Sequence, residues 1–188
     1  MHKMKILLFG VSNVGKTTVG EILADKIGYD FYDIDSEIKK RYNITLEKFV
    51  HLGTIEDRDR KRGIIIRNLV KRKSNMVIAI TPMSYPCYFK DVLENDDVIA
   101  IELRDTPENI FDRLVFSDEN DIVYKDDEYK NTYSDYYLKE IKEDLAWYGK
   151  VFSVIDNKYD MNNQKSDKVA DEIINRFDLM KKRKDILE

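Results

Sequence analysis

The sequence is poor in cysteine, proline and histidine, and it lacks any long apolar run. Its 188 residues include one cysteine, three prolines and two histidines. The single Cys87 excludes an internal disulfide, which favours a reducing compartment such as the cytoplasm. The apolar run at residues 6–9 ends at Gly10 and is too short for a signal-peptide core or a membrane span. We therefore expect a cytoplasmic protein without a membrane segment.

No charge of one sign dominates the chain either. Lysine and arginine number 32 and aspartate and glutamate 36, which leaves a net charge of −4. A net-acidic chain is a poor candidate for binding nucleic acid or an anionic membrane. With 43% hydrophobic residues the chain can bury a core, so we expect one globular domain over residues 1–188. Nothing in the sequence implies an obligate protein partner.

Short apolar runs alternate with segments of helical period along the chain. Strands are predicted at residues 5–9, 31–33, 76–80, 98–103 and 151–155. Helices are predicted at residues 17–27, 35–41, 45–52, 54–71, 106–116, 134–148 and 169–180, with Ile55 and Trp147 among their inward side chains. This order predicts an α/β fold, in which a parallel sheet is flanked by helices and ligands bind at the carboxyl ends of the strands.

A phosphate-binding motif follows the first predicted strand. Residues 10–17 read G-V-S-N-V-G-K-T and match G-x-x-x-x-G-K-[ST] in full. Backbone N–H groups of such a loop wrap the phosphates, the lysine reaches the β- and γ-phosphates, and the threonine hydroxyl ligates Mg²⁺. The sequence therefore predicts binding of ATP with Mg²⁺ by Gly10, Ser12, Asn13, Val14, Gly15, Lys16, Thr17 and Thr18.

Two acidic residues follow the second predicted strand. Asp33 would lie beside the phosphate loop, where a carboxylate can hold Mg²⁺ directly or through water. Asp35 would lie one step farther out, where it can accept a proton from an attacking hydroxyl. An alternative stays open, in which Asp35 only caps the next helix and Asp33 is a solvated loop residue.

These residues resemble the shikimate kinase family of small P-loop kinases. The resemblance rests on residues 10–17, on the block at 31–38, and on Gly53 with Arg58. It continues more loosely through residues 111–114, Tyr148 and residues 169–173. It implies a three-layer P-loop kinase fold with a lid, here at about residues 117–133.

The resemblance also implies roles for single residues. Lys16 and Asp35 become the catalytic residues, and Thr17 and Asp33 become the Mg²⁺ side of the site. Asp35 also becomes a ligand of the substrate hydroxyl, and Arg58 becomes a clamp for a substrate carboxylate. Arg113 is placed near the adenine or the phosphates. The alternatives are that Arg58 belongs to a solvated charged helix face, residues 57–62, and that Arg113 is a surface residue.

The sequence departs from the family where the acceptor would bind. The family's Gly-Gly-Gly turn reads Ile-Thr-Pro-Met at residues 80–83, and its lid arginine has no counterpart in residues 117–132. An arginine that grips the substrate carboxylate aligns with Asp144. A carboxylate in place of a guanidinium would repel an anionic substrate.

Two functions follow from this combination. The first is ATP-dependent phosphoryl transfer to a hydroxyl of a small metabolite, with shikimate as the family's usual acceptor and a different acceptor at least equally favoured by the departures. The second is a nucleotide-binding homologue with weak or no kinase activity that acts as a regulatory or partner module. A nucleotide or nucleoside kinase ranks below both, because a phosphorylated acceptor would require more arginine in the lid.

Overall fold

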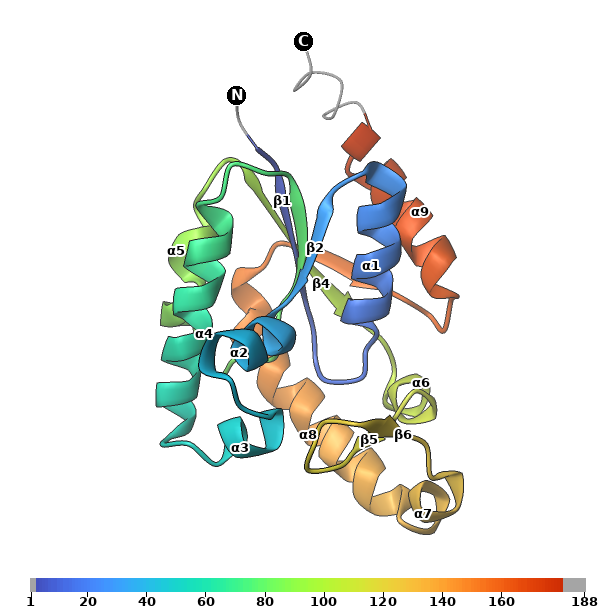
Figure 1. Ribbon diagram of the computed structural model, residues 1–188. Coiled ribbons are helices and arrows are strands. Elements are labelled where there is room, and N and C mark those ends of the chain that lie inside the picture. Colours follow the sequence, from blue (N-terminus) through green and yellow to red (C-terminus); the bar gives the residue numbers. More distant parts are fainter. Residues whose placement is uncertain (1–2, 181–188) are drawn as a thin grey trace.

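The computed structural model describes residues 3–180 and contains one parallel sheet between two layers of helices (Figure 1). The strands lie in the order β2-β3-β1-β4-β7. Their bounds are β1 Lys5–Phe9, β2 Asp30–Asp33, β3 Met76–Ala79, β4 Val98–Arg104 and β7 Asn157–Asp160. All four pairings are parallel, which confirms the predicted α/β class.

The longer helices cover the two faces of the sheet. Their bounds are α1 Lys16–Ile27, α2 Ile34–Tyr42, α3 Leu46–Val50, α4 Ile55–Val70, α8 Ser134–Val151 and α9 Ser166–Arg176. Shorter ones are η1 Pro86–Tyr88, α5 Lys90–Leu93, α6 Pro107–Asp112, α7 Asp127–Thr132 and η2 Phe152–Val154. Figure 1 shows α1 and α9 together on one face and α4 and α5 on the other.

The alternation of side chains along β1 explains the two cores. Ile6 and Leu8 pack with residues of α1 and α9, whereas Leu7 and Phe9 pack with residues of α4 and the segments that follow it. All four side chains are fully buried. A strand that is apolar on both faces is typical of the middle of a parallel sheet, and it carries the loop after β1 to the lower edge in Figure 1.

The last predicted strand was wrong. Residues 152–154 form the 3₁₀ helix η2, and the strand at the sheet edge is β7, the polar segment at residues 157–160. Phe152 and Ile155 are buried against the sheet from η2, so this apolar run satisfies packing without strand pairing. In β7 only Tyr159 is buried, because an edge strand needs fewer apolar side chains.

Two further side chains are more exposed than the periodicity predicts. Ile55 and Trp147 are 52% and 55% exposed. Ile55 stands in the first turn of α4, beside the exposed capping box of Thr54 and Asp57. In α8, Leu145 and Tyr148 take the inward positions on either side of Trp147.

The predicted lid contains regular structure that the sequence pattern did not show. The strands β5 Phe116–Ser117 and β6 Val123–Tyr124 pair antiparallel, and α7 follows them. The helix predicted to reach residue 116 ends at Asp112, because Phe116 joins this hairpin and contacts the rings of Tyr124, Tyr129 and Tyr137.

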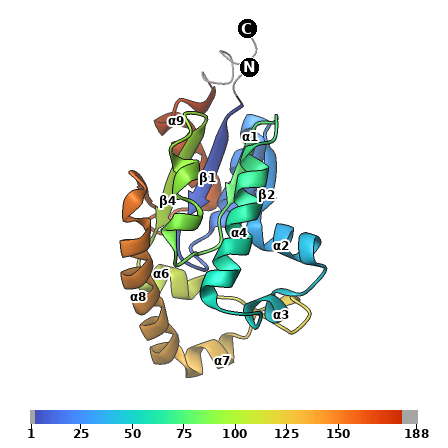
Figure 2. The same cartoon turned by 90° about the vertical axis from the view of Figure 1, so that its left-hand side faces the viewer.

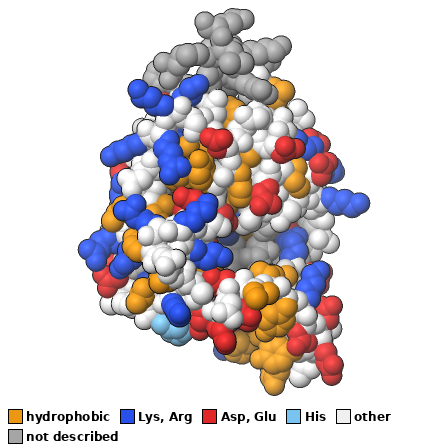
Figure 3. Space-filling model, in the orientation of Figure 1, with side chains coloured by type: hydrophobic (Ala, Val, Ile, Leu, Met, Phe, Trp, Pro, Cys, Tyr) orange, Lys and Arg blue, Asp and Glu red, His pale blue; other side chains and the backbone are white. Residues whose placement is uncertain are grey.

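The hairpin and α7 lie at the same end of the molecule as α3, below the sheet in Figures 1 and 2. Figure 3 shows apolar side chains gathered over this region, with acidic side chains at their edges. Ile122 and Val123, at the turn of the hairpin, are each 63% exposed.

Candidate active site

The loop between β1 and α1 has the backbone that the motif requires. Gly10 and Gly15 have φ angles of 141° and 111°, and Asn13 has a φ of 58°. A Cβ at Gly10 would lie 2.5 Å from the carbonyl oxygen of Leu103 and 2.9 Å from Val14 Cγ1. Gly15 is the N-cap of α1 and offers no capping side chain, so the first N–H groups of the helix face the loop.

Lys16 lies within this loop with its side chain almost fully buried. Its Nζ donates to the carbonyl oxygens of Gly10 at 3.0 Å and Val11 at 2.7 Å. Burial lowers the pKa of Lys16 to about 8, and the carboxylates of Asp35 and Asp33 act in the opposite direction. A partly desolvated ammonium group near neutral pH is a strong electrostatic partner for a phosphate.

Thr17 and Asp33 meet beside the loop. The Thr17 hydroxyl donates to Asp33 Oδ2 at 2.8 Å, and Asp33 Oδ1 accepts from the backbone N–H groups of Asp35 and Ser36 at 2.9 and 3.2 Å. Asp33, and not Asp35, is therefore the N-cap of α2, which corrects the alternative raised from the sequence.

This pair fits Mg²⁺. Within residues 3–180 no cluster of three or more His, Cys, Asp or Glu side chains would hold a metal by protein ligands alone. Mg²⁺ in phosphoryl-transfer sites takes only one or two protein oxygens, together with phosphate and water. The hydroxyl of Thr17 and the carboxylate of Asp33 supply hard oxygens of that kind, next to the loop.

Asp35 is the second residue of α2, two positions after Asp33. Its Oδ1 accepts a hydrogen bond of 2.6 Å from the Thr81 hydroxyl. Burial raises the pKa of Asp35 above its usual value, Thr81 lowers it, and Asp33 adds to the increase. A carboxylate with a raised pKa is a better proton acceptor than a solvated one.

A cavity of about 520 Å³ joins these groups. Its walls carry two cations and two carboxylates, and they include the turn after β3 and the hairpin of the lid. The lining residues are Ser12, Asn13, Lys16, Thr17, Asp33, Asp35, Ser36, Lys39, Leu46, Ala79, Thr81, Pro82, Val115, Phe116, Ser117 and Val123. We call it the phosphate cavity.

A second cavity of about 250 Å³ adjoins it and shares Ser12, Thr81 and Pro82 with it. Its other walls come from the end of α3, from α4, from the turn after β3 and from α8. These are Val50, Ile55, Arg58, Asp59, Arg62, Ser84 and Tyr148. We call it the acceptor cavity.

Arg58 lines the acceptor cavity, where its Nη1 donates to the Gly53 carbonyl oxygen at 3.3 Å. The charged segment 57–62 is not uniformly solvated, since Asp59 is fully buried and Arg62 is only 9% exposed. Arg62 pairs with Asp59 at 3.1 Å and its guanidinium lies 5.2 Å from the centre of the Phe49 ring. The Nε atom of Arg62 is buried without a hydrogen-bond partner.

The turn after β3 is tied to α4 through the same aspartate. Asp59 Oδ2 accepts from the backbone N–H groups of Ser84 at 2.7 Å and Tyr85 at 3.1 Å. These amides are therefore engaged within the protein. Sequence reasoning missed Asp59, Arg62 and the Thr81 hydroxyl; their signal was the spacing of Asp59 and Arg62 by three residues on a helix.

Arg113 contacts the phosphate loop without lining the phosphate cavity. Its Nε donates to the Asn13 carbonyl oxygen at 3.4 Å, and its Nη2 pairs with Asp105 at 2.6 Å. Asp105 is fully buried as a side chain and also accepts from Asn109. The structure thus places Arg113 beside the loop, where it stabilises the loop backbone through its hydrogen bond to the Asn13 carbonyl oxygen.

Asp144 does not line the acceptor cavity, so the expectation that its carboxylate lies there was wrong; the carboxylate on that wall belongs to Asp59. Tyr148, one turn later on α8, lines that cavity instead. Burial raises the pKa of Tyr148, and the nearby Asp144 carboxylate adds to this increase. Burial also raises the pKa of Asp144 itself, together with Glu140 and Glu143.

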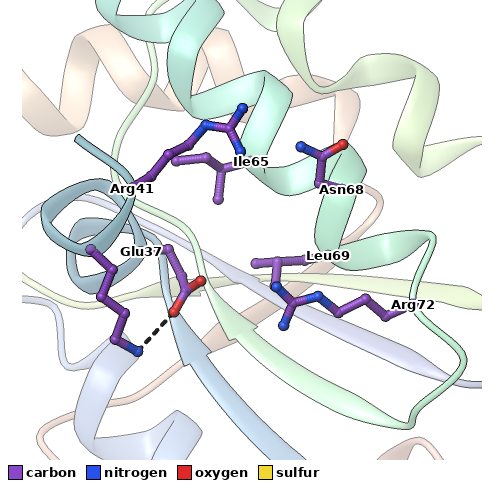
Figure 4. A pocket seen from close by; sticks show the side chains of 7 residues that line it. Glu37, Arg41, Ile65, Asn68, Leu69 and Arg72 are labelled. Atoms are coloured by element: carbon purple, nitrogen blue, oxygen red, sulfur yellow. Dashed lines mark hydrogen bonds and ion pairs between the residues drawn. The ribbon is translucent and has the colours of Figure 1, made fainter. Parts of the chain in front are cut away.

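Another hollow, of about 240 Å³, lies between α2 and α4 on the opposite side of α2 (Figure 4). Figure 4 shows Arg41 and Glu37 of α2 facing Asn68 and Leu69 of α4. It has no residue of the phosphate loop on its walls. We therefore do not assign the phosphates to it.

Comparison with known proteins agrees with this geometry. Residues 12–178 match the family described as shikimate kinase. This chain belongs to the shikimate kinase family. The match confirms the family predicted from the sequence, and members of this family are typically ATP- and Mg²⁺-dependent phosphotransferases.

Individual family members show how far the likeness extends. A shikimate kinase of Persephonella marina is 29% identical over 176 residues, covering 92% of this chain and 98% of that protein. One of Azobacteroides pseudotrichonymphae is 33% identical over 113 residues, and the match spans 59% of this chain and 65% of the relative's length. The structure of a shikimate kinase from Bacteroides thetaiotaomicron has a TM-score of 0.74 at 19% identity, covering 93% of this chain and 98% of that one.

No helix in residues 3–180 combines the length and the apolar character that crossing a membrane requires.

Proposed function

We propose that this chain transfers the γ-phosphoryl group of Mg·ATP to a hydroxyl group of a small metabolite. One observation carries the proposal: the phosphate cavity and the acceptor cavity meet at Thr81, and the Thr81 hydroxyl holds Asp35 at that junction. A base at the boundary between a phosphate site and a second cavity is what transfer to a hydroxyl requires.

On the nucleotide side, the backbone of the loop and Lys16 bind the phosphates. Thr17 and Asp33 would hold Mg²⁺, which would supply positive charge to offset that of the phosphates. Arg113 supports the loop through the Asn13 carbonyl oxygen. In the transfer, the acceptor oxygen bonds to the γ-phosphorus, the bond to the bridging oxygen breaks with its electron pair left on ADP, and the acceptor proton passes to Asp35.

On the acceptor side, Arg58 and Arg62 both line the cavity, so a hydroxylated metabolite with an anionic group is favoured. Shikimate is the family's usual acceptor and is the first compound to test. The cavity differs from a glycine-lined one because Thr81 and Pro82 occupy its wall. These side chains favour a hydroxylated carboxylate whose shape differs from that of an acceptor bound against a glycine-lined wall.

The test is ADP release from Mg·ATP by the purified protein, with and without shikimate. A shikimate-dependent rise, absent in Asp35→Asn, supports transfer to this acceptor. If shikimate gives no rise while ATP binding is measurable, a panel of hydroxylated carboxylates decides between another acceptor and no transfer. Phosphorylated product, identified by mass spectrometry, separates transfer from hydrolysis.

The second candidate is a nucleotide-binding homologue that acts as a regulatory or partner module. The engagement of the Ser84 and Tyr85 amides by Asp59 favours it, because these groups are not free for an acceptor. ATP binding without product from any acceptor in the panel would support this alternative over the kinase.

We also propose that residues 1–188 act as one domain in the cytoplasm, with no nucleic acid, membrane or obligate protein partner. The shared sheet of the described residues and the single cysteine support this view.

A further inference from the structure

The phosphate cavity contains a second cation that the motif does not include. Of the side chains that line it, Lys16 and Lys39 carry positive charge, and Asp33 and Asp35 carry negative charge. Lys39 comes from α2, one turn after Asp35, and its side chain is 39% exposed. It therefore lines the same cavity as the phosphate loop.

A carboxylate of the lid forms an ion pair with Lys39. Its Nζ lies 3.6 Å from Asp121 Oδ2, and Asp121 belongs to the turn between β5 and β6. The Asp121 side chain is only 9% exposed. Both of its carboxylate oxygens also accept from the Leu46 N–H at the start of α3, at 3.0 and 2.9 Å. One carboxylate thus ties the hairpin to α3 and to Lys39.

The backbone of Asp121 shows that this contact is built into the turn. Its φ is 62°, in the left-handed region, which an aspartate adopts more readily than most residues but still at a cost. Its N–H donates to the Asp118 carbonyl oxygen at 3.0 Å. The turn therefore holds the carboxylate toward α2 and α3 instead of toward solvent.

The cations of the lid itself are directed elsewhere. Lys130 lies 5.3 Å from the centre of the Phe111 ring and pairs with Asp127 at 3.2 Å. Neither Lys130 nor Lys125 lines the phosphate cavity. Phosphoryl transfer gathers negative charge on the oxygens of the moving group, and a cation placed there in advance speeds the step.

We propose that Lys39 is a catalytic residue that stabilises the phosphoryl group in transfer, and that Asp121 is a positioning residue that holds Lys39 when the hairpin lies against α3. This inference rests on the proposed function, because it requires nucleotide phosphates in the phosphate cavity. In this proposal the cation that stabilises the phosphoryl group comes from α2, because neither lysine of the lid lines the phosphate cavity.

The test compares the affinity for Mg·ADP alone with the affinity for Mg·ADP plus aluminium fluoride, which mimics the phosphoryl group in flight. Lys39→Ala should weaken the aluminium fluoride complex by about 10²-fold and leave the affinity for Mg·ADP within about threefold. Lys39→Arg should restore most of the loss. The matched control is Lys40→Ala, since Lys40 neighbours Lys39 but pairs with Glu37 and lines the hollow of Figure 4.

Asp121→Asn tests the positioning role, because the amide oxygen can still accept from Leu46 while the charge facing Lys39 is gone. We expect a smaller loss than in Lys39→Ala, and no added loss when the two changes are combined. Losses that multiply in the double variant would show that Asp121 acts independently of Lys39.

The outcomes separate this inference from the proposed function. If the unchanged protein forms the aluminium fluoride complex and Lys39→Ala binds it equally well, the role of Lys39 is overturned and the kinase proposal stands. If the unchanged protein binds no Mg·ADP, or gains nothing from aluminium fluoride, both are overturned.

Discussion

The phosphate cavity and the acceptor cavity share a wall but are built in different ways. On the phosphate side, the groups expected to bind phosphate and Mg²⁺ come from two short segments, the loop after β1 and the end of β2, and the turn after β3 and the lid hairpin complete the walls. The acceptor side is assembled from α4, the turn after β3 and α8, which lie far apart along the chain. A local motif keeps its chemistry through its own spacing, whereas a site assembled across the fold can be rebuilt one contact at a time.

The polar groups on the two sides are also used differently. On the phosphate side, burial shifts the pKa values of Lys16 downward and Asp35 upward, as expected for groups that handle charge and protons. On the acceptor side, Asp59 satisfies two backbone amides and Arg62. These contacts hold the protein's own turn, so much of the polarity there serves the structure.

Lys16→Ala gives the largest expected effect on the phosphate side. Loss of the cation within the loop should reduce phosphoryl transfer by about 10⁴-fold. Steady-state ADP release and nucleotide titration measure it. Lys26→Ala is the control, since Lys26 lies on the same helix and pairs at the surface with Asp171. Near-normal turnover of Lys16→Ala would contradict a role of the phosphate loop in the transfer.

On the acceptor side, Asp59→Ala should give the largest effect, and that effect is a loss of stability rather than of activity. It leaves Arg62 and two backbone amides without their partner, which should lower the free energy of unfolding by about 3–5 kcal/mol. Denaturant unfolding measures this. Asp57→Ala, which removes an exposed part of the α4 capping box, should cost about 1 kcal/mol. Equal losses in the two variants would contradict the structural role of Asp59.

Asp35→Asn tests the junction of the two cavities. The change keeps an acceptor for the Thr81 hydroxyl but removes the base, so turnover should fall by about 10²-fold or more. Nucleotide affinity should stay within about threefold, as measured by calorimetry. Asp25→Asn, on the exposed face of α1, serves as the control. Turnover at the normal rate would leave Asp35 with a role in packing and hydrogen bonding only.

The pH dependence of nucleotide affinity gives the smallest predicted effect. The pKa of Lys16 is lowered to about 8, and a bound phosphate raises it again because it favours the ammonium form. Affinity for Mg·ADP should therefore be full below pH 8 and weaken by about tenfold between pH 7 and pH 9. Calorimetric titrations at three pH values, with circular dichroism to verify the fold, measure this. A constant affinity would show that Lys16 does not titrate in this range.

The sheet and the phosphate loop were predictable because each depends on local sequence. Strands such as β1 and β3 are short apolar runs, and the loop is defined by two glycines and Lys16. The proximity of Thr17 and Asp33 followed from the rule that carboxyl ends of parallel strands meet at one edge.

The rest depends on tertiary contacts. Asp59 and Arg62 belong to a run of charges that looks solvated in sequence, and only the approach of the turn after β3 buries them. Asp121 lies in a polar segment whose link to Leu46 spans 75 positions. The η2 segment was mistaken for a strand because an apolar run packs equally well from a 3₁₀ turn.

The first glycine of the loop limits which substitutions the chain can accept if it loses its activity during evolution. A side chain at Gly10 would meet the Leu103 carbonyl oxygen of β4, so the sheet itself demands glycine there. A descendant that lost catalysis would be free to change Lys16, but selection for a folded protein would still retain Gly10. The survival of that glycine in a relative therefore records an intact sheet and says nothing about an active kinase.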